Sequence, residues 1–348
     1  MRRMMVLGAA GAVAAAVGLI SFTLGLAVMV RDPGEAIMPA KVKEPQLVTN
    51  TIAPRPIPVQ PSMPPVVSPL SPSPTAFPGL GRTNAMVAAI PTCRNLNVLG
   101  VSRVIEIDTA DGPGFGFENF KAHDFLREHE VLLTFDDGPW LGNTAAILKA
   151  LADQCTKAMF FPVGKHTMWH PEILKQVAAA GHTIGSHSWS HADLSKLPIS
   201  KAKDEFEKGA SAVRAALGVP GASFFRFPGL RHPPEMVTYL GTRNIGIFST
   251  DMDSFDFKIR KPEQVIASVM TKLEKRGKGI VLLHDIQHAT ALAMPALLAQ
   301  LHAGGYKIVQ VVGKGSLQTL PEYDEAIAKE FRNTVSTRPT STVVRTLE

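Results

Sequence analysis

From residue 131 onward, short apolar segments alternate with longer segments of helical periodicity. Seven apolar runs have the length of buried strands, at residues 131–135, 158–163, 183–186, 224–227, 245–250, 280–283 and 308–312. Between them lie stretches in which apolar residues recur every three or four positions. This alternation predicts parallel strands wrapped by helices, arranged either as an open sheet or as a closed barrel.

Two of the helical stretches carry start or stop signals. Residues 200–217 have apolar residues at helical spacing, and Gly218 follows them as a helix stop. Residues 262–277 begin with Pro262, a residue suited to the first turn of a helix. We therefore expect both stretches to be helices that cover the strands.

The amino-terminal segment has a different pattern. No charged residue occurs from residue 4 to residue 30, and the segment is almost wholly apolar or small. About 20 apolar residues suffice to cross a membrane, so residues 1–30 are predicted to be a transmembrane signal anchor. Arg2 and Arg3 precede the apolar run, which favours a cytoplasmic amino end and a periplasmic remainder. The alternative is a cleaved signal peptide, which would make the protein secreted.

Proline density separates this segment from the rest of the chain. Ten prolines fall between residues 54 and 78, so residues 31–92 are predicted to be a disordered, extended linker. Residues 93–315 are long enough to form one domain with a sizeable core. Residues 316–348 are predicted to form a C-terminal helix and a disordered tail.

Charge and cysteine content argue against nucleic-acid binding and against redox or zinc sites built from cysteine pairs. The formal net charge is +6, but no basic stripe interleaved with aromatic residues occurs, which argues against nucleic-acid binding. Cys93 and Cys155 are the two cysteines, so the C-x-x-C spacing of redox and zinc sites is absent. Because cysteines tend to pair in an oxidising compartment, we predict a disulfide between Cys93 and Cys155. The oligomeric state is left open by the sequence.

Ionisable side chains follow the predicted strands. Asp136 and Asp137 end the first strand, and His187 follows the third. The carboxyl ends of parallel strands meet at one face of a barrel, where barrel enzymes have their active sites. Adjacent residues at a strand end point in different directions, so the two aspartates can take different roles.

A metal site is predicted at the same face. His191 stands four residues after His187, and on a helical turn this spacing directs both rings to one ion. Two histidines and one carboxylate leave coordination positions open for water and substrate, as a catalytic metal requires. The sequence therefore predicts metal-assisted hydrolysis.

Five short segments occur in a fixed order. They are T-F-D-D-G-P at 134–139, H-S-W-S-H at 187–191, R-F-P-G at 226–229, D-S-F-D-F at 253–257 and L-L-H at 282–284. In this order they resemble the motifs of the NodB-like polysaccharide deacetylases, carbohydrate esterase family 4, and the first two segments are the most specific. The resemblance implies a deformed (β/α) barrel of about seven parallel strands. It also implies removal of acetyl groups from N-acetylated sugars with one divalent metal ion, commonly zinc.

The resemblance assigns a role to each matching residue. Asp137, His187 and His191 correspond to the metal ligands of the family. Asp136 corresponds to the general base that activates the attacking water, and His284 to the acid that protonates the departing amine.

Three further positions support these groups. Arg226 corresponds to the residue that pairs with Asp136, and Asp256 to the partner that holds and tunes His284. Leu282 corresponds to part of the pocket for the acetyl methyl group.

Two departures from the family pattern concern substrate preference. Phe257 stands where the fourth motif usually has tryptophan, and Gly229-Leu230 replaces a tyrosine of the third motif. A backbone N–H near Gly229 is expected to stabilise the negative tetrahedral intermediate. Trp140, directly after the first motif, is predicted to form a sugar-stacking wall, with plain packing as the alternative.

Other ionisable residues receive non-catalytic interpretations. His182 is expected to support a strand rather than to bind metal, and Asp253 lies near the site, although only Asp256 matches the motif. The remaining histidines near the motifs are expected on the surface or at the rim of the cleft; they are His166, His170, His232 and His288.

Taken together, these features predict a membrane-anchored, extracytoplasmic hydrolase acting on carbon–nitrogen bonds other than peptide bonds. Its expected substrate is an N-acetylglucosamine-type residue in a polysaccharide such as peptidoglycan, a chitooligosaccharide or an exopolysaccharide. One alternative is a deacylase of another amide-bearing envelope sugar. The other is a catalytically silent carbohydrate-binding domain, against which the presence of both Asp136 and His284 argues, because a binding domain needs no acid and base.

Overall fold

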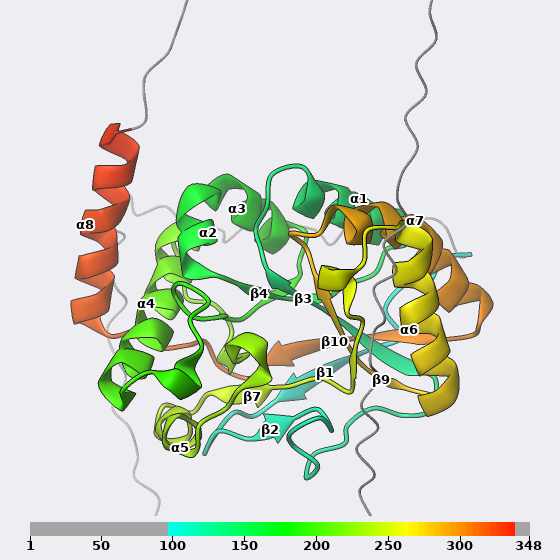
Figure 1. Cartoon of the computed structure of the whole chain (residues 1–348), viewed down its shortest axis with the longest axis horizontal. Helices are drawn as coiled ribbons and strands as arrows, with labels where there is room; N and C mark the ends of the chain where they lie inside the picture. Colours follow the sequence, from blue (N-terminus) through cyan, green and yellow to red (C-terminus); the bar gives the residue numbers. More distant parts are fainter. Residues whose placement is uncertain (1–96, 338–348) are drawn as a thin grey trace, which may run out of the picture. The chain divides into compact units, whose positions relative to one another are not determined.

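The computed structural model describes residues 97–337, which fold as parallel strands wrapped by helices (Figure 1). The strands are β1 (Arg103–Ile107), β2 (Gly114–Phe115), β3 (Glu130–Asp137), β4 (Met159–Pro162), β5 (Thr183–Ile184), β6 (Phe224–Phe225), β7 (Gly246–Phe248), β8 (Met252–Asp253), β9 (Gly279–His284) and β10 (Lys307–Gly313). The α-helices are α1 (Asn143–Asp153), α2 (Gly164–Trp169), α3 (Pro171–Ala179), α4 (Ile199–Leu217), α5 (Pro234–Thr242), α6 (Pro262–Arg276), α7 (His288–Ala303) and α8 (Pro321–Thr337). Three short 3₁₀ helices are η1 (Leu194–Lys196), η2 (Pro228–Leu230) and η3 (Asp256–Lys258).

The strands form two sheets. The larger sheet has the order β1-β10-β3-β4-β5, with β9 beside β3 and β8 beside β9, and the smaller sheet has the order β2-β7-β6. Each pairing between these strands is parallel. A parallel bridge between Ser186 and Phe225 joins the end of β5 to β6, so one sheet continues into the other. The parallel α/β fold is confirmed, and its arrangement is consistent with the deformed barrel of the NodB type.

Strand β3 occupies the centre and has two different faces. Leu132 packs in the interior cluster that includes Phe161 and Phe248. Leu133 and Phe135 belong instead to the cluster that lies under the helices. Because successive side chains in a strand point to opposite faces, Asp136 is on the interior face with Leu132. Its register partner on β9 is His284.

The apolar runs locate seven of these strands correctly, namely β3, β4, β5, β6, β7, β9 and β10. Three strands were not predicted. Strand β1 alternates between half-buried and exposed positions and lies at the sheet edge, while β2 and β8 have two residues each. Both predicted helices are confirmed as α4 and α6, and each ends at a glycine with positive φ, Gly218 (78°) and Gly277 (82°).

Several predictions fall outside the described residues. They concern the anchor at 1–30, the linker at 31–92, Cys93 and the tail after residue 337. Helix α8 lies where a C-terminal helix was predicted, whereas the domain boundaries themselves stay predictions. Within residues 97–337, no helix is both long and apolar enough to span a membrane.

Candidate active site

The two aspartates that end β3 face different surroundings. Asp136 is 2% exposed and belongs to the interior face of the strand. Asp137 has a positive φ of 78°, which turns the chain out of the strand. Its Oδ1 atom is buried and has no hydrogen-bond partner among the described residues. A buried carboxylate oxygen without a donor is costly, so this atom is placed to bind a ligand.

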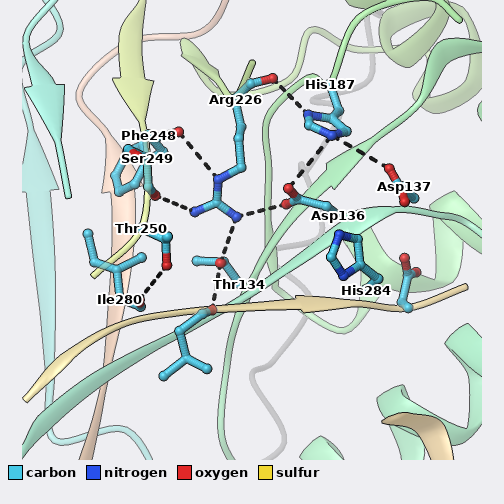
Figure 2. A network of polar contacts seen from close by, with 12 residues as sticks. Thr134, Asp136, Asp137, His187, Arg226, Phe248, Ser249, Thr250, Ile280 and His284 are labelled. Atoms are coloured by element: carbon cyan, nitrogen blue, oxygen red, sulfur yellow. Dashed lines mark hydrogen bonds and ion pairs between the residues drawn. The ribbon is translucent and has the colours of Figure 1, made fainter. Parts of the chain in front are cut away.

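The two histidines of the second motif lie beside Asp137. His187 Nδ1 lies 2.7 Å from the carbonyl oxygen of Arg226, and this contact fits an Nδ1–H donor, which leaves Nε2 as a free acceptor. That Nε2 is 3.5 Å from Asp137 Oδ1 (Figure 2). His191 Nε2 is 3.3 Å from the same oxygen. The two imidazole rings are 5.0 Å apart.

The expectation that these histidines share a helical turn is wrong. Residues 187–193 have no helical structure, and Ser188 and His191 have positive φ values of 67° and 60°. The backbone N–H of Trp189 bonds to the carbonyl oxygen of Glu205, and that of Ser190 bonds to the Glu205 carboxylate. Contacts with α4 therefore replace the hydrogen bonds of a helical turn.

The three residues fit a divalent metal ion. One ligand atom from each of Asp137, His187 and His191 lies within 4.8 Å of the others. Burial lowers the pKa of His187, despite the raising effect of Asp136 and Asp137, and this keeps the ring neutral. A neutral imidazole and an unpaired carboxylate oxygen are suitable ligands for zinc and related ions.

Arg226 holds Asp136 from the interior of the barrel (Figure 2). Its fully buried guanidinium donates from Nη1 to Asp136 Oδ1 at 2.8 Å and to Thr134 Oγ1 at 2.7 Å. The other nitrogens donate to the carbonyl oxygens of Ser249 at 2.8 Å and Phe248 at 3.3 Å. This is the pairing that the resemblance implies, and it fixes Asp136 Oδ1 so that Oδ2 is left 3.7 Å from His187 Nε2.

His284 is held by Asp256 through two contacts. Nδ1 of the imidazole is 2.6 Å from Asp256 Oδ1, and the backbone N–H donates to Oδ2 at 2.8 Å. The hydroxyl of Thr290 also donates to Oδ2, at 2.5 Å. Burial alone would lower the pKa of His284, but the hydrogen bond and charge of Asp256, with the charges of Asp137 and Asp136, raise it to about 9. The ring is therefore cationic at neutral pH.

These groups open into one cleft of about 340 Å³. Its lining comprises Asp136, Asp137, His187, His191, Phe227, Gly229, Leu230, Asp253, Phe257, Leu282 and His284. The Phe257 ring meets the His284 ring edge-on with 5.6 Å between centroids. Leu282 and Gly229 thus lie where the sequence placed them, and Phe257 supplies an aromatic wall.

Trp140 does not belong to this lining. Its ring packs edge-on against His166 and His170, with centroid distances of 5.3 and 6.1 Å, and is 37% exposed. The indole packs against these two histidines instead, which fits the alternative of plain packing better than the predicted sugar-stacking wall. His182 has the expected supporting role, because its Nδ1 accepts the backbone N–H of Ala158 at 3.2 Å.

Sequence reasoning gave no role in the site to three residues of this region. Asp253 was expected near the site, and it does line the cleft together with His284; its position at the start of the fourth motif was the available signal for a role. His166 was assigned to the rim, but its Nδ1 lies 2.6 Å from the backbone oxygen of Asp137. Asp285 follows His284 directly at the end of a predicted strand, and sequence reasoning gave it no role in the site.

Asp285 secures the turn that follows β3. Its carboxylate accepts hydrogen bonds from the Gly138 N–H and the Thr144 hydroxyl, both at 2.7 Å. Burial raises its pKa to about 7, against the lowering effect of these two donors. A Cβ atom on Gly138 would lie 2.0 Å from Asp285 Oδ2, so glycine is required at this close approach. The turn that presents Asp137 thus depends on Asp285.

Comparisons with known proteins agree with this geometry. The sequence model of the family described as polysaccharide deacetylase matches residues 125–245. A peptidoglycan-N-acetylglucosamine deacetylase of Listeria monocytogenes is 32% identical over 187 residues, which is 52% of this chain and 38% of that protein. A chitooligosaccharide deacetylase of Rhizobium leguminosarum is 26% identical over 211 residues, covering 56% of this chain and 92% of that protein.

A solved structure is also similar. The peptidoglycan deacetylase of Bdellovibrio bacteriovorus aligns with a TM-score of 0.57 and 36% identity, covering 64% of this chain and 61% of that chain. The chain thus spans well under half of the Listeria relative and about three-fifths of the Bdellovibrio one.

A parallel α/β fold with an Asp-His-His cluster beside a carboxylate and a histidine held by a carboxylate defines the polysaccharide deacetylase class. The chain belongs to the NodB-like polysaccharide deacetylases, carbohydrate esterase family 4. Members of this family are hydrolases of the amide bond of N-acetyl sugars.

Proposed function

We propose that this protein removes acetyl groups from N-acetylglucosamine-type residues of a polysaccharide, using one divalent metal ion. One observation supports this proposal above all others. A single cleft contains the three convergent ligand atoms of Asp137, His187 and His191 and, beside them, Asp136 and His284. A carboxylate base and a cationic acid on one cleft are needed for amide hydrolysis and not for sugar binding.

Asp137, His187 and His191 would hold the ion, with zinc as the ion best matched to one carboxylate and two imidazoles. When bound, such an ion polarises the amide carbonyl and acidifies the attacking water. The hydrogen bond from His187 Nδ1 to the Arg226 carbonyl oxygen fixes the ring orientation that this role requires.

Asp136 serves as the general base. Its Oδ1 is held by Arg226, while Oδ2 faces the histidine side of the cleft and accepts the proton of the attacking water. The interior ion pair fixes the direction of the carboxylate, so the group needs no reorientation during the reaction.

His284 serves as the general acid. Asp256 holds Nδ1, which leaves the opposite ring nitrogen to donate its proton to the departing amine. An amine is a poor leaving group unless it is protonated, and the raised pKa of His284 supplies the proton at neutral pH. Proton acceptance by Asp136 and proton donation by His284 thus take place within one cleft.

The cleft lining suits an acetylated sugar. Leu282 and Phe257 offer apolar surface for the acetyl methyl group and the sugar face, and the Gly229 N–H is the proposed donor to the negative tetrahedral intermediate. The names of the relatives make peptidoglycan and chitooligosaccharides the first substrates to try. Membrane anchoring and a periplasmic location, as predicted from residues 1–30, would give access to such glycans.

Acetate release provides the test. Chitooligosaccharide, peptidoglycan and N-acetylated exopolysaccharide are incubated with native protein, with chelator-treated protein and with protein reloaded with Zn²⁺. The proposal expects release that is lost on chelation and restored by the ion. Absence of release from each glycan by the zinc-loaded protein would favour a deacylase of another envelope sugar or a silent binding domain, and glycan binding by the same protein would separate these two.

A further inference from the structure

The segment that carries both metal-ligand histidines depends on neighbouring helices for its shape. The N–H groups at the start of α2 donate to this segment: Gly164 to the oxygen of Ser188 and Lys165 to the oxygen of Trp189, both at 2.9 Å. On the other side, the Trp189 N–H donates to the oxygen of Glu205 in α4 at 2.8 Å. Backbone hydrogen bonds thus hold the segment to α2 on one side and to α4 on the other.

The fit between this segment and the two helices leaves no spare volume. A Cβ atom on Gly164 would lie 2.7 Å from Cε3 of the Trp189 ring, and one on Gly209 of α4 would lie 2.5 Å from the carbonyl carbon of Ser188. Both distances are too short for a side chain. Small displacements of Trp189 are therefore transmitted directly to the backbone next to His187 and His191.

Helix α8 contributes to the apolar cluster in which Trp189 is buried. The indole is 9% exposed and belongs to a cluster with Met168 of α2, Ala212 of α4 and Ile327 of α8, which is 1% exposed. Phe331, one turn further along α8, packs against the same cluster. Figure 1 shows α8 lying alongside α4, at the opposite side of the fold from α6 and α7.

Polar contacts fix α8 on α4 at its amino-terminal end. The Tyr323 hydroxyl donates to Asp204 Oδ1 at 2.7 Å, and Asp324 forms an ion pair with Arg214. Thr319, just before the helix, donates to the Asp324 carboxylate at 2.9 Å. These contacts set the position of the helix, so Ile327, one turn further along, is held in the cluster that contains the indole.

We propose that α8 is a positioning element of the metal site. Through the apolar cluster that Ile327 shares with Trp189, it holds the segment that orients His187 and His191 toward Asp137. The helix lies beyond residues 125–245, the part of the chain matched by the family model. The inference rests on the proposed function only in that these three residues hold a divalent ion, and it does not depend on which glycan is the substrate.

The physical basis is that His191 has little support of its own. Its side chain is 45% exposed, so its direction is set by the backbone of the segment and by the hydrogen bond from its N–H to Ser188 Oγ at 3.1 Å. Truncating Ile327 leaves a cavity in the cluster that contains the indole, and the segment can partly fill this cavity by moving. Loss of groups that orient metal ligands typically weakens metal binding about 10–100-fold.

The test measures zinc affinity rather than activity. Full-length Ile327→Ala is compared with Leu301→Ala, a matched truncation of a buried aliphatic residue on α7 that does not contact the histidine segment. Zn²⁺ is titrated into each metal-free protein against a chromophoric chelator, and thermal unfolding is recorded in parallel. We expect about tenfold weaker zinc binding for Ile327→Ala, a near-native value for Leu301→Ala and recovery in Ile327→Val.

Equal zinc affinities in Ile327→Ala and Leu301→Ala, at similar losses of thermal stability, would overturn the inference and reduce α8 to a stabilising helix. Phe331→Leu serves as the second variant if Ile327→Ala does not fold, with a smaller weakening expected for the same reason. The outcome is separate from that of the proposed function: native protein that binds zinc but releases no acetate would refute the deacetylase proposal and leave the positioning role intact.

Discussion

Arg226 and Asp136 form an ion pair in the interior of the barrel, with 2.8 Å between Nη1 and Oδ1 and side chains that are 0% and 3% exposed. The arginine also donates to two backbone carbonyl oxygens and to Thr134, so its hydrogen-bonding capacity is largely used. The pair fixes the orientation of the Asp136 carboxylate. Because both side chains are buried, removal of either one leaves the other without a partner.

Arg226→Met is expected to destabilise the fold strongly, because it leaves the Asp136 carboxylate buried and unpaired. Removing one member of a buried pair typically costs about 3–5 kcal/mol, which urea denaturation can measure. Lys149→Ala, which removes the exposed ion pair with Asp153, is the control and should change the unfolding midpoint little. Similar midpoints for the two variants would contradict this view of the pair.

Asp136→Asn should suppress turnover while leaving metal bound. The amide oxygen can still accept the Arg226 hydrogen bond, but the group cannot take a proton from water. General base catalysis contributes roughly 10²–10⁴-fold, so acetate release should fall by that factor, with unchanged zinc content by metal analysis. An unchanged rate would remove Asp136 from the mechanism.

His187→Ala should abolish metal binding, because its Nε2 is one of the three convergent ligand atoms. Metal analysis after dialysis should show loss of zinc together with loss of activity. His288→Ala, at an exposed position of α7, is the control and should retain both. Full zinc occupancy in His187→Ala would show that the ligand assignment is wrong.

Asp256→Asn should shift the alkaline limb of the pH–rate profile. His284 must be protonated to act as the acid, and its raised pKa, about 9, places the loss of activity at high pH. Without the Asp256 charge the pKa falls, so the limb moves to lower pH in kcat/KM. A cation held by Asp137 opposes the raising effect of that carboxylate, so the limb of the zinc-loaded protein should lie below pH 9. If the alkaline limb of the Asp256→Asn profile did not move, His284 would not be the group that titrates in that limb.

The same group links stability to pH in the metal-free protein. A pKa raised from the ordinary 6.5 to about 9 means that the folded state binds the His284 proton more tightly than the unfolded state. The contribution of His284 to the free energy of unfolding is therefore fully present below pH 6.5, and it is lost as the pH rises through 9. Urea denaturation across this range should show a decline that is smaller in Asp256→Asn.

The predicted disulfide between Cys93 and Cys155 can be tested by mass spectrometry. Non-reduced protein should lack free thiols after denaturation, and reduction should lower stability by up to about 4 kcal/mol for a loop of this length. Two free thiols in the denatured protein would refute the bridge and weaken the case for a periplasmic location.

The sequence predicted the elements that have a strong local signal. Uninterrupted apolar runs such as 131–135 and 280–283 located β3 and β9, and the motifs placed Asp136 and His284 at their ends. Strand β8 was missed because two residues carry no periodicity. Local spacing could not reveal the non-helical histidine segment, because Glu205, fifteen positions beyond Ser190, satisfies its backbone.

Contacts between distant parts of the chain account for the other omissions. Asp285 lies 147 positions from Gly138, and the two meet only when β9 pairs with β3. The cluster that joins Ile327 and Trp189 similarly requires α8 to pack against α4. The sequence of the C-terminal stretch predicts only a helix, and the fold brings that helix to the cluster that contains Trp189.

The pairing of Asp136 with His284 across β3 and β9 has an evolutionary consequence. Neighbouring strands are held about 4.8 Å apart by main-chain hydrogen bonds. The backbone pairing of β3 with β9 therefore sets the separation between the residues that act as base and acid. Gly229, Leu230 and Phe257, by contrast, come from the short helices that follow other strands. Substitutions at the residues that line the sugar side of the cleft can therefore change substrate preference during evolution without altering the positions of Asp136 and His284.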